Sequence, residues 1–239
     1  MYTLLMDKII EIRDEVLNKL VNKLEGFYLA GGTALSLFYF QHRESYDLDF
    51  FTKNFSRVNV EEIMSGLSKD MGLEIELSGE QNKQGFARMM VYSLIIDDNC
   101  SLKIDFVEDV YKLLKPLKEA NRIPVLAIED IYMRKILTAC GSIPTIDSFG
   151  RGSFAGGRQE AKDFFDLYFL SKTFMPLSSF AGEYCRQPQK ESIIIWFRTY
   201  DRLEMKTGLL EIITNKQVAF QEMELHFKQE TEKIIATQL

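Results

Sequence analysis

Residues 27–35 spell FYLAGGTAL and residues 43–51 spell RESYDLDFF, and these two pieces of sequence decide the fold. Together they predict a short buried strand, a glycine turn, a helix and a second strand. Because side chains alternate between the faces of an extended strand, Asp47 and Asp49 point to one side while Leu48 points into the core. Two carboxylates held this close repel each other. A divalent cation such as Mg²⁺, which binds carboxylate oxygens readily, would settle between them.

The glycine turn, Gly31-Gly32-Thr33, lies at the start of the helix predicted between the two strands. Glycine has no Cβ atom, so the backbone can come close to a ligand at this point. The backbone N–H groups at the start of a helix have no partner within the helix and suit a phosphate group. The sequence therefore predicts a phosphate site next to a metal site.

In this order, with Arg43 and Ser45 in place, the GGTAL run and the D-x-D strand resemble the nucleotidyltransferase-like toxins of the AbiEii/AbiGii group. These toxins are relatives of the MenT toxins within the DNA polymerase β-like nucleotidyltransferase superfamily. Superfamily members carry a glycine turn, then about a dozen residues, then the D-x-D strand, and here thirteen residues separate Thr33 from Asp47. The resemblance covers roughly residues 26–170.

A third carboxylate stands in the segment LKIDF, residues 102–106. Strand alternation sends its three apolar side chains inward and places Asp105 with Lys103 on the opposite face. A lone acid in a buried strand is costly unless it is paired. The resemblance implies a third metal carboxylate on a neighbouring strand, and we expect it to be Asp105. Glu108 and Asp109 are the alternatives, but they stand at the strand end, where solvation is the usual explanation.

The helical half of the chain continues the resemblance. Family members have a lysine on the helix after the catalytic sheet, and later a basic-Asp-x-x-Asp-Leu stretch; Lys135 and the segment KDFFDL, residues 162–167, stand at these places. The resemblance implies that Lys135 offsets charge on a triphosphate. Asp163 and Asp166 lie three residues apart, hence on one helix face. They would orient Lys135 or Arg158 by ion pairs, or cap the site against the acceptor, and an inert helix–helix salt bridge is an open alternative for Asp166.

Hydrophobic periodicity and turn residues predict an α/β (α+β) chain that becomes helical in its C-terminal part. The resemblance implies a nucleotidyltransferase fold, with a mixed β-sheet flanked by helices and followed by a C-terminal helical region. We expect a catalytic core over residues 1–125 and, over residues 126–239, a helical region that completes the active-site cleft. Helices are predicted over residues 7–24, 33–41, 59–71, 127–140, 158–172, 178–186, 191–202 and about 203–237. Strands are predicted over residues 27–30, 73–77, 86–96 and 101–107, besides the D-x-D strand. Residues 111–124 are predicted to be a crossover, and residues 141–157, with five glycines, a mobile loop that closes over a nucleotide.

The composition excludes several classes of protein. The 239 residues carry a net charge of −6, which argues against a surface that grips duplex DNA through many phosphates. No stretch reaches the roughly 18 apolar residues that a membrane span needs. Acidic residues near the N-terminus argue against a signal peptide, and three widely spaced cysteines predict reduced core thiols, so we expect a cytoplasmic protein with no membrane partner. His42 is expected to face solvent from a loop.

The resemblance implies a metal-dependent nucleotidyltransferase, the toxin of an AbiEii-like toxin–antitoxin or abortive-infection system. It would use two Mg²⁺ or Mn²⁺ ions to move a nucleotide from an NTP to a hydroxyl group of an RNA, such as a tRNA end, or of a protein, and it would have a cognate antitoxin. The expected metal ligands are Asp47, Asp49 and Asp105, with Lys135 and Asp163 as further catalytic residues. The expected substrate-binding residues are Gly31, Gly32, Thr33, Arg43, Ser45, Arg158 and Asp166. Two alternatives remain: a catalytically inert binding module of the same fold, and a phosphotransferase that uses the same metals.

Overall fold

The computed structural model describes residues 2–98, 100–146, 150 and 152–237. The chain forms two compact units, which we call unit 1 (residues 1–39 and 45–130) and unit 2 (residues 40–44 and 131–239). The short segment 40–44 therefore belongs to unit 2, although the sequence on both sides of it belongs to unit 1.

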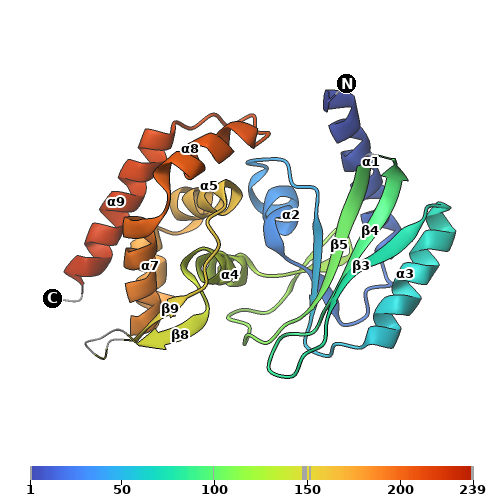
Figure 1. Cartoon of the computed structure of the whole chain (residues 1–239), viewed down its shortest axis with the longest axis horizontal. Helices are drawn as coiled ribbons and strands as arrows, with labels where there is room; N and C mark the ends of the chain where they lie inside the picture. Colours follow the sequence, from blue (N-terminus) through green and yellow to red (C-terminus); the bar gives the residue numbers. More distant parts are fainter. Residues whose placement is uncertain (1, 99, 147–149, 151, 238–239) are drawn as a thin grey trace. The chain divides into compact units, whose positions relative to one another are not determined.

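Unit 1 contains a seven-stranded mixed sheet in the order β3-β4-β5-β2-β1-β7-β6 (Figure 1). Two neighbouring pairs, β2 with β5 and β1 with β7, are parallel, and the other pairs are antiparallel. The strands are β1 (Phe27–Leu29), β2 (Leu48–Thr52), β3 (Ile75–Gln81), β4 (Met89–Asp97), β5 (Cys100–Glu108), β6 (Lys118–Ala120) and β7 (Ile123–Val125). The predicted fold class, a mixed sheet with flanking helices, is confirmed.

Three helical segments accompany this sheet: α1 (Tyr2–Leu20), α2 (Gly31–Leu35), which continues as a π-helical turn (Ser36–Phe40), and α3 (Arg57–Met71). The α3 helix begins earlier than predicted because the Ser56 hydroxyl, and not Asn59, provides the N-cap: it accepts a hydrogen bond from the Asn59 backbone N–H. Its end is as predicted, since Gly72 takes the left-handed conformation of a helix C-terminus, with φ of 64°.

The core of unit 1 follows from the alternation in β5. Leu102, Ile104 and Phe106 are at most 1% exposed, as predicted. The Phe106 ring packs against Phe27 of β1, with centroids 5.1 Å apart, and against Phe50 of β2, at 5.4 Å. Apolar side chains from three strands thus cover one face of the sheet and leave the alternate positions of β2 and β5 to the other face.

The prediction of a plain crossover over residues 111–124 is wrong, because β6 and β7 lie within or next to it. Each has only three residues, too few for strand alternation to show in the sequence. The approach to these strands is fixed by Asp130, a buried residue near the start of the next helix. Its carboxylate accepts hydrogen bonds from the backbone N–H groups of Leu114 and Lys115, at 2.8 and 3.0 Å.

The larger part of unit 2 is helical, as predicted. Its helices are α4 (Ile128–Cys140, which starts in unit 1), α5 (Ala161–Phe169), α6 (Leu177–Tyr184), α7 (Gln187–Thr199), α8 (Arg202–Gly208) and α9 (Phe220–Ala236), with a π-helical turn (Leu170–Phe174) and a 3-10 turn (Leu209–Glu211). The prediction of one continuous helix over about residues 203–237 is wrong, since residues 212–219 are not helical. Aromatic rings join α5 to α7 and α9: Phe164 lies 5.9 Å from Trp196 and 4.9 Å from Phe227, between centroids.

The predicted loop over residues 141–157 contains a β-hairpin instead. Strand β8 (Ile143–Ile146) pairs with β9 (Gly152–Ala155), and β9 contacts α7 through a 2.7 Å hydrogen bond from the Phe154 N–H to the Ser192 hydroxyl (Figure 1). Residues 147–149 and 151 of the predicted loop lie outside the described residues. The many glycines suggested a structureless loop, whereas the hairpin is held by pairing and by α7.

Two other expectations can be compared with the structure. Cys100, Cys140 and Cys185 are buried and free, as predicted. None of the helices in the described part of the chain is both long and apolar enough to span a membrane.

Truncation of Phe106 tests the proposed core. Replacement by Ala should lower the free energy of unfolding by about 3–5 kcal/mol, because a fully buried ring that contacts β1 and β2 leaves a cavity. Denaturant unfolding measures the change. Phe86, which is 65% exposed, is the matched control, and Phe86→Ala should change stability little. Equal losses in the two variants would contradict this assignment of the core.

Candidate active site

The carboxylates on β2 and β5 of unit 1 lie next to one another. In the parallel pairing of these strands, Asp49 is directly opposite Asp105 and Leu48 is opposite Ile104. Asp47 comes directly before β2, and its charge acts on Lys103 of β5. We call Asp47, Asp49, Lys103 and Asp105 the β2–β5 cluster. Its members share one face of the sheet because they alternate with buried apolar residues on both strands.

Asp105 is the most enclosed member of the cluster, with 7% of the whole residue exposed. One of its oxygens, Oδ2, forms an ion pair with the Lys103 ammonium, whereas Oδ1 is buried and has no hydrogen-bond partner among the described residues. Burial raises the pKa of the Asp105 carboxyl above its ordinary value; Lys103 opposes this rise and the charge of Asp47 adds to it. A buried acceptor without a partner is costly, so Asp105 is suited to receive a cation at Oδ1.

The cluster carries excess negative charge. Three carboxylates against one ammonium leave a formal charge of −2. Burial alone would lower the pKa of Lys103, but its hydrogen bond to Asp105 and the fields of Asp105, Asp47 and Asp49 raise it. Among the residues that the structure describes, no three His, Cys, Asp or Glu side chains are placed so that together they could hold a metal ion. By charge and by its hard oxygen donors the cluster nevertheless fits a divalent cation.

Gly31 brings the backbone against this cluster. Its φ of +69° lies in the left-handed region that favours glycine, and a Cβ atom here would lie 2.1 Å from Oδ2 of Asp49. The neighbouring Ala30 N–H donates to the Asp49 carbonyl oxygen at 2.9 Å. A side chain at position 31 would therefore collide with a proposed metal ligand.

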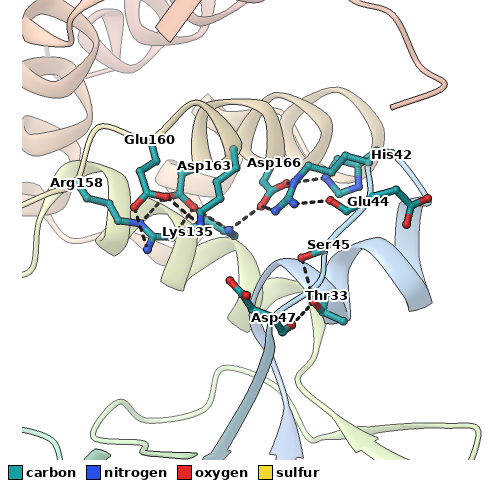
Figure 2. Close-up of polar contacts among 12 residues, drawn as sticks. Thr33, His42, Glu44, Ser45, Asp47, Lys135, Arg158, Glu160, Asp163 and Asp166 are labelled. Carbon is teal, nitrogen blue, oxygen red and sulfur yellow. Dashed lines mark hydrogen bonds and ion pairs between the residues drawn. The ribbon is translucent and has the colours of Figure 1, made fainter. Parts of the chain in front are cut away.

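Thr33 and Ser45 hold the start of β2. The Thr33 hydroxyl is fully buried and donates to the Asp47 carbonyl oxygen, and a 2.9 Å hydrogen bond joins it to the Ser45 hydroxyl (Figure 2). Arg13 of α1 donates to the Ser45 carbonyl oxygen at 2.7 Å. In this structure Thr33 and Ser45 thus position the backbone beside Asp47.

Unit 2 contains a second group of charges, the α4–α5 network. Lys135 of α4 is 7% exposed, and its ammonium lies 2.7 Å from Oδ1 of Asp163 and 2.6 Å from Oδ2 of Asp166, both on α5 (Figure 2). The two aspartates, three residues apart, face the same lysine. The structure thus pairs Lys135 with both aspartates.

Asp166 is also paired with the segment 40–44. Arg43 donates to its two oxygens from Nε at 2.6 Å and from Nη2 at 2.8 Å, and His42 Nε2 lies 2.7 Å from Oδ1. Burial would raise the pKa of Asp166, but the charges of Lys135 and Arg43 and these hydrogen bonds hold it well below its usual range. Asp166 is therefore a fully buried carboxylate that stays ionised.

The expectation that His42 faces solvent is wrong. Its side chain is fully buried, with its ring stacked on Phe165 at 5.8 Å between centroids and 5.1 Å from the ring of Phe169. Burial lowers the pKa of His42, so at neutral pH the neutral ring donates from Nε2 to Asp166. No local pattern could have shown this, because the partner lies 124 positions further along the chain.

Arg158 closes the other end of the network. It donates to Asp163 from Nε at 2.6 Å and from Nη2 at 3.2 Å, while its own side chain is 47% exposed. Burial would raise the pKa of Asp163, but Lys135 and Arg158 together lower it. A surface carboxylate, Glu160, lies 3.3 Å from Arg158 Nη1. Arg158 is thus the cation of the network that reaches solvent.

Three further hydrogen bonds fasten segment 40–44 within unit 2. The Glu44 N–H donates to the Ile213 carbonyl oxygen at 2.8 Å, the Thr214 hydroxyl donates to the His42 carbonyl oxygen, and Lys216 donates to the Phe40 carbonyl oxygen at 2.6 Å. All three partners lie in the non-helical stretch 212–219. That interruption between α8 and α9 therefore has a structural role.

The two alternatives to Asp105 have other partners. Glu108 forms a two-point ion pair with Arg88, at 2.7 and 3.0 Å. Asp109 is 4% exposed, accepts from the Tyr28 hydroxyl and lies 3.1 Å from the Lys53 ammonium. The expectation that solvent explains the charge of Asp109 is wrong. Asp109 is buried and anchors the end of β5.

Comparison with known families gives a match over most of the chain. The family model described as nucleotidyl transferase AbiEii toxin, type IV toxin–antitoxin system, matches residues 16–234. No curated protein matches the sequence.

Two solved structures are similar over nearly their whole length. JHP933 from Helicobacter pylori has a TM-score of 0.55 and 16% identity, over 97% of this chain and 95% of that one. A candidate nucleotidyltransferase from H. pylori has a TM-score of 0.56 and 18% identity, over 94% of this chain and 96% of that one. At these identities the likeness shows a shared fold.

Gly31→Ala tests the close approach between the glycine turn and Asp49. The variant should lose stability and displace the Asp49 side chain, because the new methyl group would overlap Oδ2. Melting temperatures and a crystal structure of the variant measure both effects. Gly66→Ala is the matched control: Gly66 lies within α3 with open space around it, so Ala should raise the free energy of unfolding by about 0.5–1 kcal/mol. A Gly31→Ala variant as stable as Gly66→Ala would contradict the geometry.

Asp166→Asn tests the buried network. Removal of this charge leaves Lys135 and Arg43 undercompensated in the interior, so the free energy of unfolding at neutral pH should fall by about 3–5 kcal/mol. In the exposed Lys8–Asp97 pair, Asp97→Asn should have little effect.

Acid titration of stability gives a second measure of the same variant. The pKa values of Asp163 and Asp166 are lowered from 3.8, so the stability that their charges contribute is present above pH 3.8 and is lost as the pH falls below it. Asp166→Asn should therefore lose less stability than the parent between pH 5 and pH 2. Parallel pH profiles would show that Asp166 is not ionised in the folded protein.

Proposed function

Because the chain belongs to the AbiEii family of nucleotidyl transferase toxins, we propose that it transfers a nucleotide from an NTP to a hydroxyl group. The acceptor is an RNA end, such as that of a tRNA, or a protein, and a cognate antitoxin restrains the activity. The observation that carries this proposal is the β2–β5 cluster, in which Asp47, Asp49 and Asp105 share a face of adjacent strands beside Gly31.

The three carboxylates would hold two Mg²⁺ or Mn²⁺ ions. When bound, such ions lower the pKa of an acceptor hydroxyl and neutralise charge around a phosphate. Asp105 contributes the oxygen Oδ1, which is buried and without a hydrogen-bond partner in the described part of the chain. Asp47 and Asp49 contribute the opposite side of the site from β2. The side chain of Thr33 fixes the backbone at Asp47, so the ligands are held before the ions arrive.

The glycine turn would bind the phosphates. Gly31 and Gly32 form the first turn of α2, where backbone N–H groups are available, and Gly31 has no side chain to keep a ligand away from Asp49. The acceptor hydroxyl would give its proton to water and its oxygen would attack the α-phosphorus to form a new P–O bond. The bond from that phosphorus to the bridging oxygen would break, and pyrophosphate would leave with the electron pair. Positioning and charge neutralisation supply the rate enhancement.

The α4–α5 network of unit 2 compensates its own charges. Three cations, Lys135, Arg43 and Arg158, face three carboxylates, Asp163, Asp166 and Glu160, so with His42 neutral the formal charge is zero. We assign Lys135 a positioning role, since it is buried between two carboxylates. Arg158 is the member that an anionic substrate can reach, because its side chain is 47% exposed.

One observation favours a second candidate, a catalytically inert binding module of the same fold. The Lys103 ammonium already occupies one oxygen of Asp105, as an internal cation would in a site that no longer binds metal. The two candidates differ in whether the chain binds divalent cations and forms a labelled product.

Labelled nucleotides test the proposed function. The purified chain, each α-³²P-NTP and MgCl₂ are incubated with total RNA and, separately, with a protein extract. The parent should label one of these acceptors, and Asp49→Asn should lose at least about 100-fold in rate, the upper range seen when even an outer partner of a metal is removed. Asp97→Asn, which changes a surface carboxylate, is the control.

The same incubation separates the alternatives. Label transferred from γ-³²P-NTP in place of α-³²P-NTP would indicate a phosphotransferase. Absence of product with every NTP and both acceptors, together with no binding of Mg²⁺, would favour the inert module.

A further inference from the structure

Lys103 occupies an unusual place for a surface lysine. It stands two residues before Asp105 on β5, so both side chains lie on the same face, and its ammonium contacts Oδ2 of Asp105. The register places Asp49 directly opposite Asp105, and the charges of Asp47 and Asp49 also act on Lys103. Lys103 is thus inside the group of carboxylates that the proposed function assigns to metal binding.

A second lysine–aspartate pair in unit 1 shows what is particular about this one. The lysines of the Lys8–Asp97 and Lys103–Asp105 pairs are equally exposed, at 47% and 46%. Their partners differ: the side chain of Asp97 is 41% exposed and that of Asp105 is 10% exposed. Water can replace Lys8 as a partner of Asp97, so that pair contributes little. Asp105 is enclosed and adjoins further carboxylates, so its charge needs a nearby cation.

We propose that Lys103 is the built-in counter-ion of the β2–β5 cluster, and that a divalent cation competes with its ammonium for the Asp105 carboxylate. The inference deepens the proposed function and rests on it. Lys103 would maintain the cluster when no metal is bound and would set the affinity of the site.

This competition also favours divalent over monovalent cations. A monovalent ion that replaces the ammonium brings the same charge and gives no electrostatic gain. A divalent ion brings one charge more to a cluster whose formal charge is −2, and it can use Oδ1 of Asp105 in addition to Oδ2. The lysine therefore makes the site selective for doubly charged ions.

Titration calorimetry with Mn²⁺ on the full chain tests the proposal. Lys103→Met keeps the length of the side chain and removes the charge, so Mn²⁺ should bind at least about fivefold more tightly than to the parent, the lower end of coupling between two competing groups. Lys8→Met is the matched control and should leave the dissociation constant unchanged.

Melting temperature is the second readout. Without metal, Lys103→Met should melt below the parent, because Asp105 keeps a buried charge with no counter-ion, and Mn²⁺ should raise its melting temperature more than that of the parent. Lys103→Arg guards against a variant that fails to fold: it keeps the charge, so it should fold like the parent and bind Mn²⁺ no more tightly.

The possible failures are distinct. If the parent binds Mn²⁺ and Lys103→Met binds it equally or more weakly, the counter-ion role is wrong and the proposed metal site stands. If the parent binds no Mn²⁺, or Asp49→Asn binds it as well as the parent, the metal site of the proposed function is wrong and the inference falls with it.

Discussion

Parallel pairing of β2 with β5 places like charges side by side, and the organisation of unit 1 follows from this constraint. The register sets Asp49 against Asp105, and apolar neighbours on both strands prevent either side chain from turning to the other face. The surrounding residues accommodate the repulsion without removing it. Gly31 leaves room for the Asp49 carboxylate, and Lys103 neutralises part of the charge. Such an arrangement costs stability, and proteins keep such costs at sites that bind ligands.

In unit 2 the buried charge is compensated by neighbouring donors. Asp166 is fully buried and surrounded by donors, so its charge is compensated by Lys135, Arg43 and His42. A buried ion network of this kind is often no more stabilising than apolar residues of the same size. What it does supply is a defined geometry, because the N–H groups of the planar Arg43 guanidinium and His42 ring point in fixed directions. Among the named residues, the β2–β5 cluster has more carboxylates than cations, whereas both oxygens of Asp166 accept hydrogen bonds. We therefore propose a binding role for the first group and a positioning role for the second.

The sequence carried enough information to predict the parts that depend on local periodicity. Alternation in LKIDF was sufficient to place Asp105 and Lys103 on one face, and the D-x-D strand beside the glycine turn was sufficient for the fold class. The predictions that were wrong concern features that depend on distant partners or on very short elements. The burial of His42 follows from Asp166, far along the chain, and the three-residue strands β6 and β7 are too short to show a period. The hairpin β8–β9 was hidden because glycines suit a tight turn as well as a loop.

Because residues 40–44 belong to unit 2, no single continuous gene segment that leaves out unit 1 encodes the whole of unit 2. A gene fragment that begins at codon 131 would encode all the helices of unit 2 from α5 onward and still lack Arg43 and His42. Asp166 would then keep Lys135 but lose two of its named partners, and the stretch 212–219 would lose the peptide it binds. Unit 2 is therefore not a continuous piece of sequence that recombination could transplant, because five of its residues lie within the sequence of unit 1.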